Sequence, residues 1–136
     1  MALPGREDIE DIFGKLADPD TAIEFFERVA DDVDWTVMGT HPLAGRYHGR
    51  SEFIEATFDR LAPLMRDGLR LELEHVHIDG DTAIVELEAT ATTLEGKPFA
   101  NRYCWVCRFE LEMIVEVRAY LDSAMVAETV AANEPA

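Results

Sequence analysis

The sequence predicts an α+β fold in which helices dominate the first half of the chain and an antiparallel sheet follows. Three observations support this prediction. Apolar residues recur at helical spacing in three segments before residue 68, they recur at every second position from residue 69 onward, and 48% of the 136 residues are hydrophobic. The length and composition suit one domain, residues 1–136, with a packed core. The order helix, helix, strand, helix and then four strands is typical of the α+β class.

The first two helices are expected from an apolar stripe and a start signal. Apolar residues stand at i, i+3, i+4 and i+7 from Ile9 to Leu16, which places them on one helix face. A second helix is expected to begin at Asp18-Pro19-Asp20, with Asp18 as its N-cap and proline at the first helical position. This helix should end near Asp32.

A strand, a loop and a third helix are expected next. Residues 33–38 are rich in β-branched and aromatic types, which favours a strand. Residues 39–49 contain glycines and a proline and are expected to form a loop. Ser51 is the expected cap of the third helix, and Pro63 should kink this helix or tighten its last turn.

Four strands are expected in the second half of the chain. Hydrophobic and polar residues alternate in 69–79 and in 82–92, with an Asp-Gly turn between these segments. Two further strands are predicted at 99–109 and 114–121. Residues 131–136 are expected to be a loose tail.

The charge of the chain excludes several function classes. The sequence has 28 acidic and 12 basic residues, a formal net charge of −16. Phosphate contacts need clustered Lys and Arg, so neither nucleic-acid binding nor adhesion to anionic membranes is expected. No apolar run approaches about 20 residues, and the N-terminal residues lack a basic and apolar export signal. We therefore expect a cytoplasmic protein with reduced cysteines.

The charge is unevenly distributed along the chain. Residues 35–70 hold 4 acidic and 5 basic residues, whereas the segments on both sides are strongly acidic. One interpretation is a solvated surface that keeps the protein in solution. The other is that an anionic ligand would favour the arginines of this middle block. The overall charge makes a polyanion an unfavourable ligand, which leaves a neutral or weakly polar small molecule as the expected partner.

Two stretches of the sequence resemble a known superfamily. Residues 101–109 (NRYCWVCRF) and 114–122 (IVEVRAYLD) resemble the last two strands of the nuclear-transport-factor-2-like superfamily, in its SnoaL-like, ketosteroid-isomerase-related branch. Residues 34–45 (DWTVMGTHPLAG), followed by Tyr47 and Gly49, resemble the first strand and loop of that branch. The resemblance covers about residues 6–126.

This resemblance implies a specific architecture but not a specific reaction. The expected fold is a cone, or cystatin-like roll, in which a strongly curved antiparallel sheet wraps around three N-terminal helices and a pocket opens at the wide end. Members often form homodimers through the convex sheet face. Some isomerise ketosteroids, some close polyketide rings and some hydrolyse epoxides, so the fold alone is a poor guide to activity. The turn at residues 109–113 departs from the family, because it lacks the usual Asp-Gly pair.

Strand alternation suggests which side chains form the pocket. Asn101, Tyr103 and Trp105 share one face of their strand, and Arg118 and Tyr120 share one face of the last strand. If both faces are concave, these groups form a polar rim inside an apolar cone, which is typical of a small-molecule site. The alternative places them on the convex face or in a dimer interface. The candidate ligand-binding residues are Trp35, Tyr47, Asn101, Tyr103, Trp105, Arg118 and Tyr120.

Three residues are candidates for acid–base catalysis. Asp122 follows the last strand, where a desolvated carboxyl would have a raised pKa, and the resemblance places it at the catalytic Asp of limonene-epoxide hydrolases. The alternative is a capping Asp or a partner of Arg118. Glu88 could share a proton with Glu86, although both also fit a solvated strand face. His41 could serve an aldol-type cyclisation or lie in solvent.

Other specific chemistries match this sequence poorly. The Arg–Asp pair of the epoxide hydrolases falls on Glu86 and Glu88, and the groups of the steroid isomerases fall on Val37, Trp105 and Phe13. Cys104 and Cys107 stand three apart in a strand and so point to opposite faces, which disfavours a shared metal. The sequence has no glycine-rich phosphate loop.

Two functional hypotheses remain open. The first is a cofactor-independent isomerase, cyclase or hydrolase-like enzyme that acts on a small, largely apolar molecule. The second is a non-catalytic ligand-binding or dimeric interaction domain of the same fold. Neither needs a cofactor or a metal.

Overall fold

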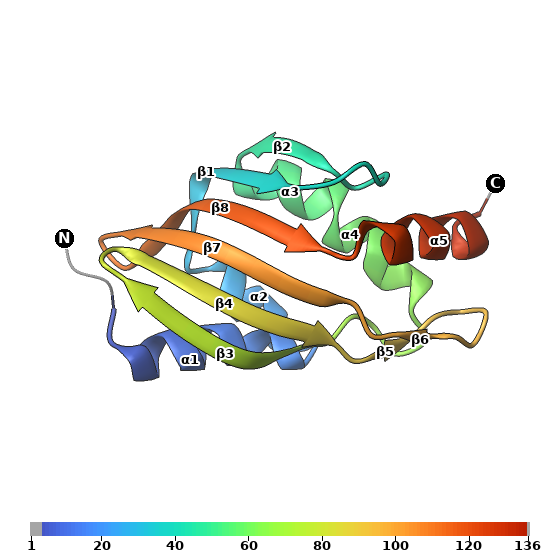
Figure 1. Ribbon diagram of the computed structural model, residues 1–136, viewed down its shortest axis with the longest axis horizontal. Coiled ribbons are helices and arrows are strands. Elements are labelled where there is room, and N and C mark those ends of the chain that lie inside the picture. Colours follow the sequence, from blue (N-terminus) through green and yellow to red (C-terminus); the bar gives the residue numbers. More distant parts are fainter. Residues whose placement is uncertain (1–3, 136) are drawn as a thin grey trace.

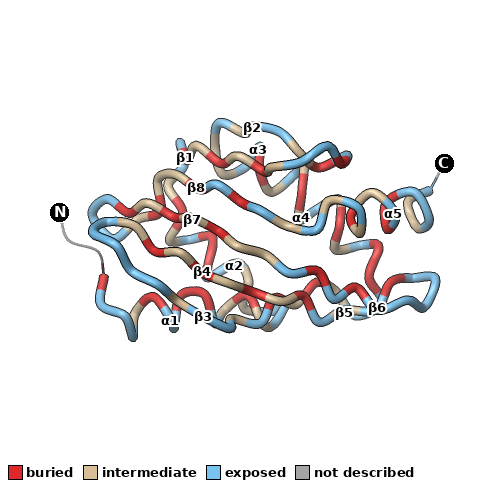
Figure 2. Tube along the Cα trace, viewed as in Figure 1, coloured by how far each residue is buried: buried red, intermediate tan, exposed pale blue. Residues whose placement is uncertain are grey.

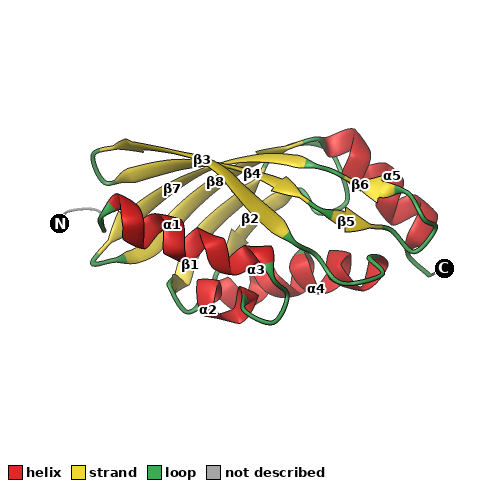
Figure 3. Ribbon diagram, turned by 90° about the horizontal axis from the view of Figure 1, so that it is seen from below, coloured by secondary structure: helices red, strands yellow, loops and turns green. Residues whose placement is uncertain are grey.

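The computed structural model describes residues 4–135 as helices that cover one side of a curved, six-stranded sheet (Figures 1 and 3). The other side of the sheet carries no helix in this part of the chain. The α+β class predicted from the sequence is confirmed. The helical elements are α1 (Arg6–Gly14), η1 (Lys15–Ala17), α2 (Ala22–Phe26), α3 (Arg50–Ala56), α4 (Phe58–Leu61), η2 (Ala62–Leu64) and α5 (Ser123–Asn133). The strands are β1 (Val29–Val37), β2 (Gly45–His48), β3 (Leu71–Asp79), β4 (Thr82–Ala89), β5 (Ala91–Thr92), β6 (Pro98–Phe99), β7 (Arg102–Glu110) and β8 (Met113–Leu121).

The sheet is mixed rather than fully antiparallel. Its strand order is β2-β1-β8-β7-β4-β3, and β5 and β6 form a separate small ribbon. The last strand, β8, inserts between β1 and β7 and runs parallel to β1, while the other neighbours are antiparallel. The antiparallel prediction is therefore wrong for this one pair, because the sequence pattern of a strand does not show its distant partner.

Buried and half-buried residues alternate along the central strands β4 and β7 (Figure 2). In β4, the residues from Ala83 to Ala89 alternate between buried and half-buried positions. In β7, Trp105, Cys107 and Phe109 are buried on the side that faces the helices. We call this helix-facing side the concave face and the opposite side the convex face. The alternation predicted for these strands is confirmed.

The helices begin at different points from those predicted. Asp18 accepts a hydrogen bond from the Asp20 amide over 2.8 Å, but it stabilises a turn, and α2 begins only at Ala22. Likewise α3 begins at Arg50 after Gly49, and no side chain caps it. Gly49 has φ of 121°, a conformation that favours glycine and sets the entry into the helix. The third helix is also interrupted, at Thr57, into α3 and α4.

The hairpin between β7 and β8 closes without glycine. Leu111 and Glu112 have φ values of 50° and 68°, the left-handed region that a two-residue hairpin turn of this type requires. The carbonyl of Glu112 accepts a hydrogen bond from Arg28 over 3.1 Å. The turn is thus tied to the helical layer although its residue types do not favour it.

The C-terminal segment is helical where a loose tail was expected. Helix α5 continues to Asn133, and its residues Thr129 and Val130 are buried. Asn133 accepts a hydrogen bond from the Glu95 amide, and Glu134 forms two short contacts with Arg60, of 2.7 and 2.9 Å. These contacts hold the segment against the end of the cone.

Candidate ligand-binding site

The interior of the cone is built from aromatic side chains. Trp35 of β1 stacks on Phe53 of α3, with ring centroids 3.8 Å apart and an interplanar angle of 20°. Trp105 of β7 meets Trp35 edge-on at 5.2 Å and also contacts Phe13 and Phe25 of the first two helices. Strands β1 and β7 and helices α1, α2 and α3 thus contribute rings to one continuous cluster. Trp35 and Trp105 thus both face the interior, and their role in ligand binding stays a prediction.

Trp35 is the unusual member of this cluster. Its side chain is 0% exposed, and among the described residues its Nε1 is the one buried side-chain nitrogen or oxygen without a hydrogen-bond partner. Native structures pair nearly all such groups, since an unpaired buried donor costs about 1–3 kcal/mol. The indole N–H is therefore a donor that lacks an acceptor in the middle of an apolar interior.

Tyr103 brings a second donor to the same face. It lies one concave position from Trp105, with ring centroids 6.2 Å apart. Burial raises the pKa of its phenol. The phenol therefore stays neutral and able to donate across the ordinary pH range.

The expected convergence of Arg118 and Tyr120 on this rim is wrong. The register pairs Trp105 with Ala119 and Tyr103 with Leu121, so Ala119 and Leu121 share the concave face. Arg118 and Tyr120 consequently lie on the convex face, where both are exposed. Alternate side chains of a strand point to opposite faces, so only every second side chain can reach the interior. In β8 the apolar side chains face inward.

Asn101 and Asp122 meet, but as a structural clamp. The Asn101 amide donates to the Asp122 carbonyl over 3.1 Å and accepts from the Asp122 amide over 2.9 Å, while Asn101 is 0% exposed. The Asp122 carboxylate accepts from the Met125 amide over 3.1 Å and so forms the N-cap of α5. Asp122 is exposed and lines none of the three cavities described below.

His41 and Tyr47 hold the loop that was expected at the pocket mouth. The Nε2 of His41 lies 3.1 Å from the Met38 carbonyl, and its Nδ1 accepts from the Leu43 amide over 3.2 Å. Desolvation lowers the pKa of this buried imidazole. The Tyr47 hydroxyl donates to the Leu43 carbonyl over 2.8 Å. The backbone thus uses both ring nitrogens of His41, so the imidazole is neither solvated nor free to act on a ligand in this arrangement.

Glu88 lies on the convex face with Glu86. Glu88 pairs with Arg102 over 3.1 Å, and Glu86 lies 3.6 Å from the Nε2 of His77. The two glutamates stand two positions apart on one strand, each with its own cross-strand partner. They form part of a charged outer surface and are remote from the concave aromatic face.

The two cysteines point to opposite faces, as predicted. Cys104 is half-buried on the convex side and Cys107 is fully buried on the concave side, both as free thiols. Burial raises the pKa of both thiols. In the described range no three His, Cys, Asp or Glu residues come together in an arrangement that could hold a metal ion.

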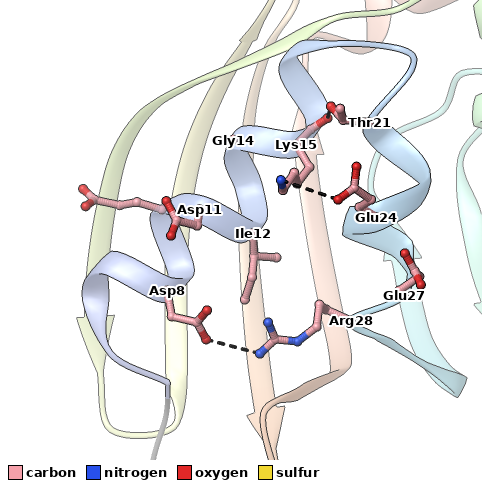
Figure 4. Close-up of a pocket in the computed structure, with 10 residues that line it drawn as sticks. Asp8, Asp11, Ile12, Gly14, Lys15, Thr21, Glu24, Glu27 and Arg28 are labelled. Carbon is pink, nitrogen blue, oxygen red and sulfur yellow. Dashed lines mark hydrogen bonds and ion pairs between the residues drawn. The ribbon is translucent and has the colours of Figure 1, made fainter.

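The largest of the three cavities described in residues 4–135 lies outside the cone. It is an open groove of about 870 Å³ between α1 and α2, and its lining is mostly charged (Figure 4). Figure 4 shows Asp8 directed toward Arg28 and Lys15 directed toward Glu24, at 3.3 and 3.5 Å respectively. These paired charges are exposed or half-exposed and describe a polar surface groove.

Two smaller cavities lie nearer the cone. One, of about 320 Å³, separates the β5–β6 ribbon from α5. The other, of about 230 Å³, lies between α2, α3 and α4, and Phe26 and Phe58 line it. Residues of the 39–49 loop line none of the three cavities. We call the third cavity the α2–α4 groove; it adjoins the aromatic cluster.

The sequence predictions missed the helical half of this site. Phe26, Phe53 and Phe58 were not among the candidate ligand-binding residues, yet they connect the α2–α4 groove to Trp35. The available signal was the high proportion of phenylalanine on the inward helix faces. Side-chain type alone does not separate a ligand-lining ring from a core ring.

Comparison with known families identifies the chain. The model of the SnoaL-like domain family matches residues 16–117. The chain is a SnoaL-like protein. Among curated proteins, this SnoaL-like chain is 34% identical over 130 residues to the dimerizing cyclase phiC of a fungal species (strain ATCC 74256), a match that covers 93% of this chain and 57% of that protein. It is 30% identical over 132 residues to the dimerizing cyclase tstC of Talaromyces stipitatus, covering 94% and 53%. The chain therefore spans little more than half the length of these relatives.

Solved structures support the cone architecture of the SnoaL-like chain. A crystal structure of an NTF2-like protein from Burkholderia thailandensis has a TM-score of 0.68 and 28% identity, covering 88% of this chain and 96% of that one. Bal32a, from a soil-derived mobile gene cassette, reaches a TM-score of 0.76 at 20% identity, covering 90% and 93%. TerC, co-crystallised with polyporic acid, reaches 0.71 at 18% identity, covering 91% and 98%. The predicted superfamily is confirmed, and the last two structures bear on the fold alone.

No helix within residues 4–135 is long and apolar enough to cross a membrane.

Proposed function

We propose that this SnoaL-like chain binds a small, neutral, largely apolar molecule in the aromatic interior of the cone and orients it for a cyclase- or isomerase-type reaction. The observation that carries the proposal is the unpaired Nε1–H of the fully buried Trp35. A carbonyl or similar oxygen of the ligand would supply the missing acceptor. The dimerizing-cyclase names of two relatives that align with nearly the whole chain agree with such a role.

The surroundings of Trp35 favour a neutral ligand. The rings of Phe53 and Trp105 flank the indole, and the concave positions of the described strands carry no carboxylate, lysine or arginine. An ionic ligand would lose its hydration there without gaining a counter-charge. The net charge of −16 further disfavours anions.

The same interior limits the chemistry. An indole N–H and a neutral phenol can polarise a carbonyl or stabilise charge that develops on its oxygen. Holding two reactive groups in a fixed geometry can itself contribute about 7–11 kcal/mol to lowering a barrier. Orientation with oxygen polarisation therefore fits this site better than proton abstraction by Glu88, which lies on the opposite face of the sheet.

The second candidate is ligand binding without catalysis. It is favoured by one observation, namely that Asp122 and His41 are engaged by the backbone at the cone end rather than directed at the aromatic interior. The catalytic role of Asp122 stays a prediction. Both candidates require the same ligand pocket, so binding can be tested before a substrate is identified.

The test uses two probes that differ in one oxygen function. We would measure binding of 2-acetylnaphthalene and of 2-ethylnaphthalene by tryptophan fluorescence in the wild type and in Trp35→Phe, which deletes the indole N–H. The substitution should weaken the ketone by about 2–10-fold more than the hydrocarbon, the value of one hydrogen bond. Trp105→Phe is the matched control, because it removes an adjacent indole and should affect both probes equally.

Two results would contradict the proposal. One is an equal loss of affinity for both probes in Trp35→Phe. The other is a wild-type protein that binds neither probe.

We also propose a homodimer formed through the convex face. Helices α1 to α4 lie on the concave side of the sheet (Figure 3). Within residues 4–135 no helix covers the convex side, which presents Ile84, Val106 and Arg118 as cross-strand neighbours. Apolar residues among charges of both signs suit a self-complementary interface. Light scattering at micromolar concentration should give a dimer. Val106→Arg should shift it toward monomer, whereas Glu55→Arg on an exposed helix position should not; a wild-type monomer would refute the proposal.

A further inference from the structure

The α2–α4 groove has the composition of a site for an apolar molecule. Its walls are largely hydrocarbon, and among its described lining residues Asp59 alone carries a charge. Ile23 stands at its rim with 67% of its surface exposed, although it is a large aliphatic side chain. This arrangement exposes apolar surface along the groove to solvent, which is a common property of binding grooves.

The groove leads to Trp35 through a short series of ring contacts. Phe58 and Phe26 both line the groove, and their centroids are 5.1 Å apart. Phe26 and Phe58 lie 6.4 and 6.0 Å from Phe53, which in turn stacks on Trp35 at 3.8 Å. Two contacts therefore separate the groove from the ring that carries the unpaired indole N–H.

The present size of the groove requires a side chain to move. Its volume of about 230 Å³ is below the range of roughly 300–1,000 Å³ that is usual for ligand pockets. Phe26 and Phe53 are 5% and 2% exposed, whereas Phe58 is only half-buried. Phe58 is thus the ring with the fewest packing constraints between solvent and Phe53.

The backbone next to Phe58 is already irregular. Thr57, with φ of −120° and ψ of −77°, interrupts the helix between Phe53 and Phe58. Its hydroxyl donates to the Phe53 carbonyl over 2.7 Å. A threonine that bonds back to the preceding turn is a common cause of helix bending. The helix break therefore lies between Phe53, which stacks on Trp35, and Phe58, which lines the groove.

We infer that the α2–α4 groove is the outer part of the ligand site and that Phe58 separates it from the aromatic interior. The inference rests on the proposed function. Displacement of Phe58 joins the groove to the interior, so that a flat, uncharged molecule keeps its hydrocarbon body in the groove and directs one terminal carbonyl to Trp35. The site therefore selects molecules with a single acceptor at one end of an apolar ring system.

The experiment measures association and dissociation rates of 2-acetylnaphthalene by stopped-flow tryptophan fluorescence. Ala62→Leu fills the groove and should slow association at least about 5-fold. Phe58→Ala should raise both association and dissociation rates, and Phe58→Leu, which retains more of the packing, should do so to a smaller extent. Ala131→Leu places the same side chain on an exposed position of α5 and should change neither rate. Thermal unfolding establishes that each variant is folded.

The outcomes separate this inference from the proposed function. One outcome is that the wild type binds the ketone better than the hydrocarbon through Trp35 while the Ala62 and Phe58 variants leave both rates unchanged. In that case the ligand does not enter through the groove, so the inference is overturned and the proposed function stands. If Trp35→Phe weakens binding of the ketone no more than binding of the hydrocarbon, the proposed function fails. Slower association in Ala62→Leu together with faster exchange in both Phe58 variants supports the inference.

Discussion

Two buried polar groups near β7 differ in one decisive respect. Asn101, next to the start of the strand, and Trp35, across β8 from its centre, are both 0% exposed. Asn101 makes two hydrogen bonds to the Asp122 backbone, whereas the Trp35 indole makes none to any residue of the described range 4–135. The two side chains are thus equally buried but differ in their hydrogen bonding. The paired group explains how the fold is held, and the unpaired group indicates where a ligand is expected to bind.

The comparison extends to His41 and Asp122. Both resemble catalytic groups by residue type, yet both are engaged by backbone atoms at the same end of the cone. We call Asn101, His41 and Asp122 the end clamp. If the comparison holds, truncating an end-clamp side chain should lower stability and leave oxygen selectivity intact. Trp35→Phe should instead reduce oxygen selectivity.

The largest effect is expected from Asn101→Ala. The substitution removes two hydrogen bonds and leaves the Asp122 amide and carbonyl without their partner, which should lower the free energy of unfolding by roughly 2–4 kcal/mol. Urea unfolding measures this change. The ratio of ketone to hydrocarbon affinity should stay at its wild-type value. A changed ratio with unchanged stability would reverse the assignment of the two regions.

The next effect is expected from His41→Phe, which should cost about 1–2 kcal/mol through two lost hydrogen bonds. The pKa of His41 is lowered in the folded state, so folding favours the neutral ring. The contribution of the neutral His41 ring to stability is fully present above its pKa in the unfolded chain, about 6.5. It is lost as the pH falls through the lower pKa of His41 in the folded state. Unfolding measured from pH 8 to pH 4.5 should lose that part of its pH dependence in the variant. An unaltered pH profile would indicate a solvated histidine.

A smaller effect separates the two roles of Asp122. Asp122→Ala should lower stability by about 1 kcal/mol because α5 loses its N-cap, whereas Asp122→Asn should be nearly neutral because asparagine caps equally well. Both are measured by thermal unfolding. Once a substrate is known, a large loss of turnover in Asp122→Asn without loss of stability would make Asp122 catalytic and would place chemistry at the end clamp.

The smallest effect concerns the β7–β8 turn, which sets the register of both strands. Replacing Leu111-Glu112 by Asn-Gly supplies residues that favour positive φ, and should raise the free energy of unfolding by about 1 kcal/mol. Probe binding should be unchanged, since the substitution keeps the pairing of β7 with β8. Reduced stability would show that the exposed Leu111 side chain contributes contacts that outweigh its backbone strain.

Local patterns were sufficient to predict most of the elements. Alternation identified β4 and β7 because each buries one face, and helical spacing identified α1 from its apolar stripe. The same rules failed at α2, where Asp18 caps a turn instead of a helix, and in β3, where the register shifts between Leu73 and His75. These features depend on contacts with other segments, which a local pattern does not contain.

The candidate site was predicted in part. Trp35, Tyr103 and Trp105 face the interior as expected, because they fall on the buried face of their strands. Arg118 and Tyr120 do not, because the concave face depends on cross-strand register as well as on alternation. The contribution of Phe53 and Phe58 was missed, since helical spacing relates a residue to the face of its own helix and not to β1.

The sequence by itself determined the class of the fold, the superfamily and which residues share one face of a strand. These follow from the sequence because periodicity and family motifs are properties of short segments. Only the tertiary structure decided which face of β8 lines the cone, what the end clamp binds and which buried donor is left unpaired. The physical reason is register. The turn at 111–112 and the irregularity between Arg108 and Phe109 align Trp105 with Ala119, and a shift of one residue would exchange every inward side chain of β8 for its outward neighbour.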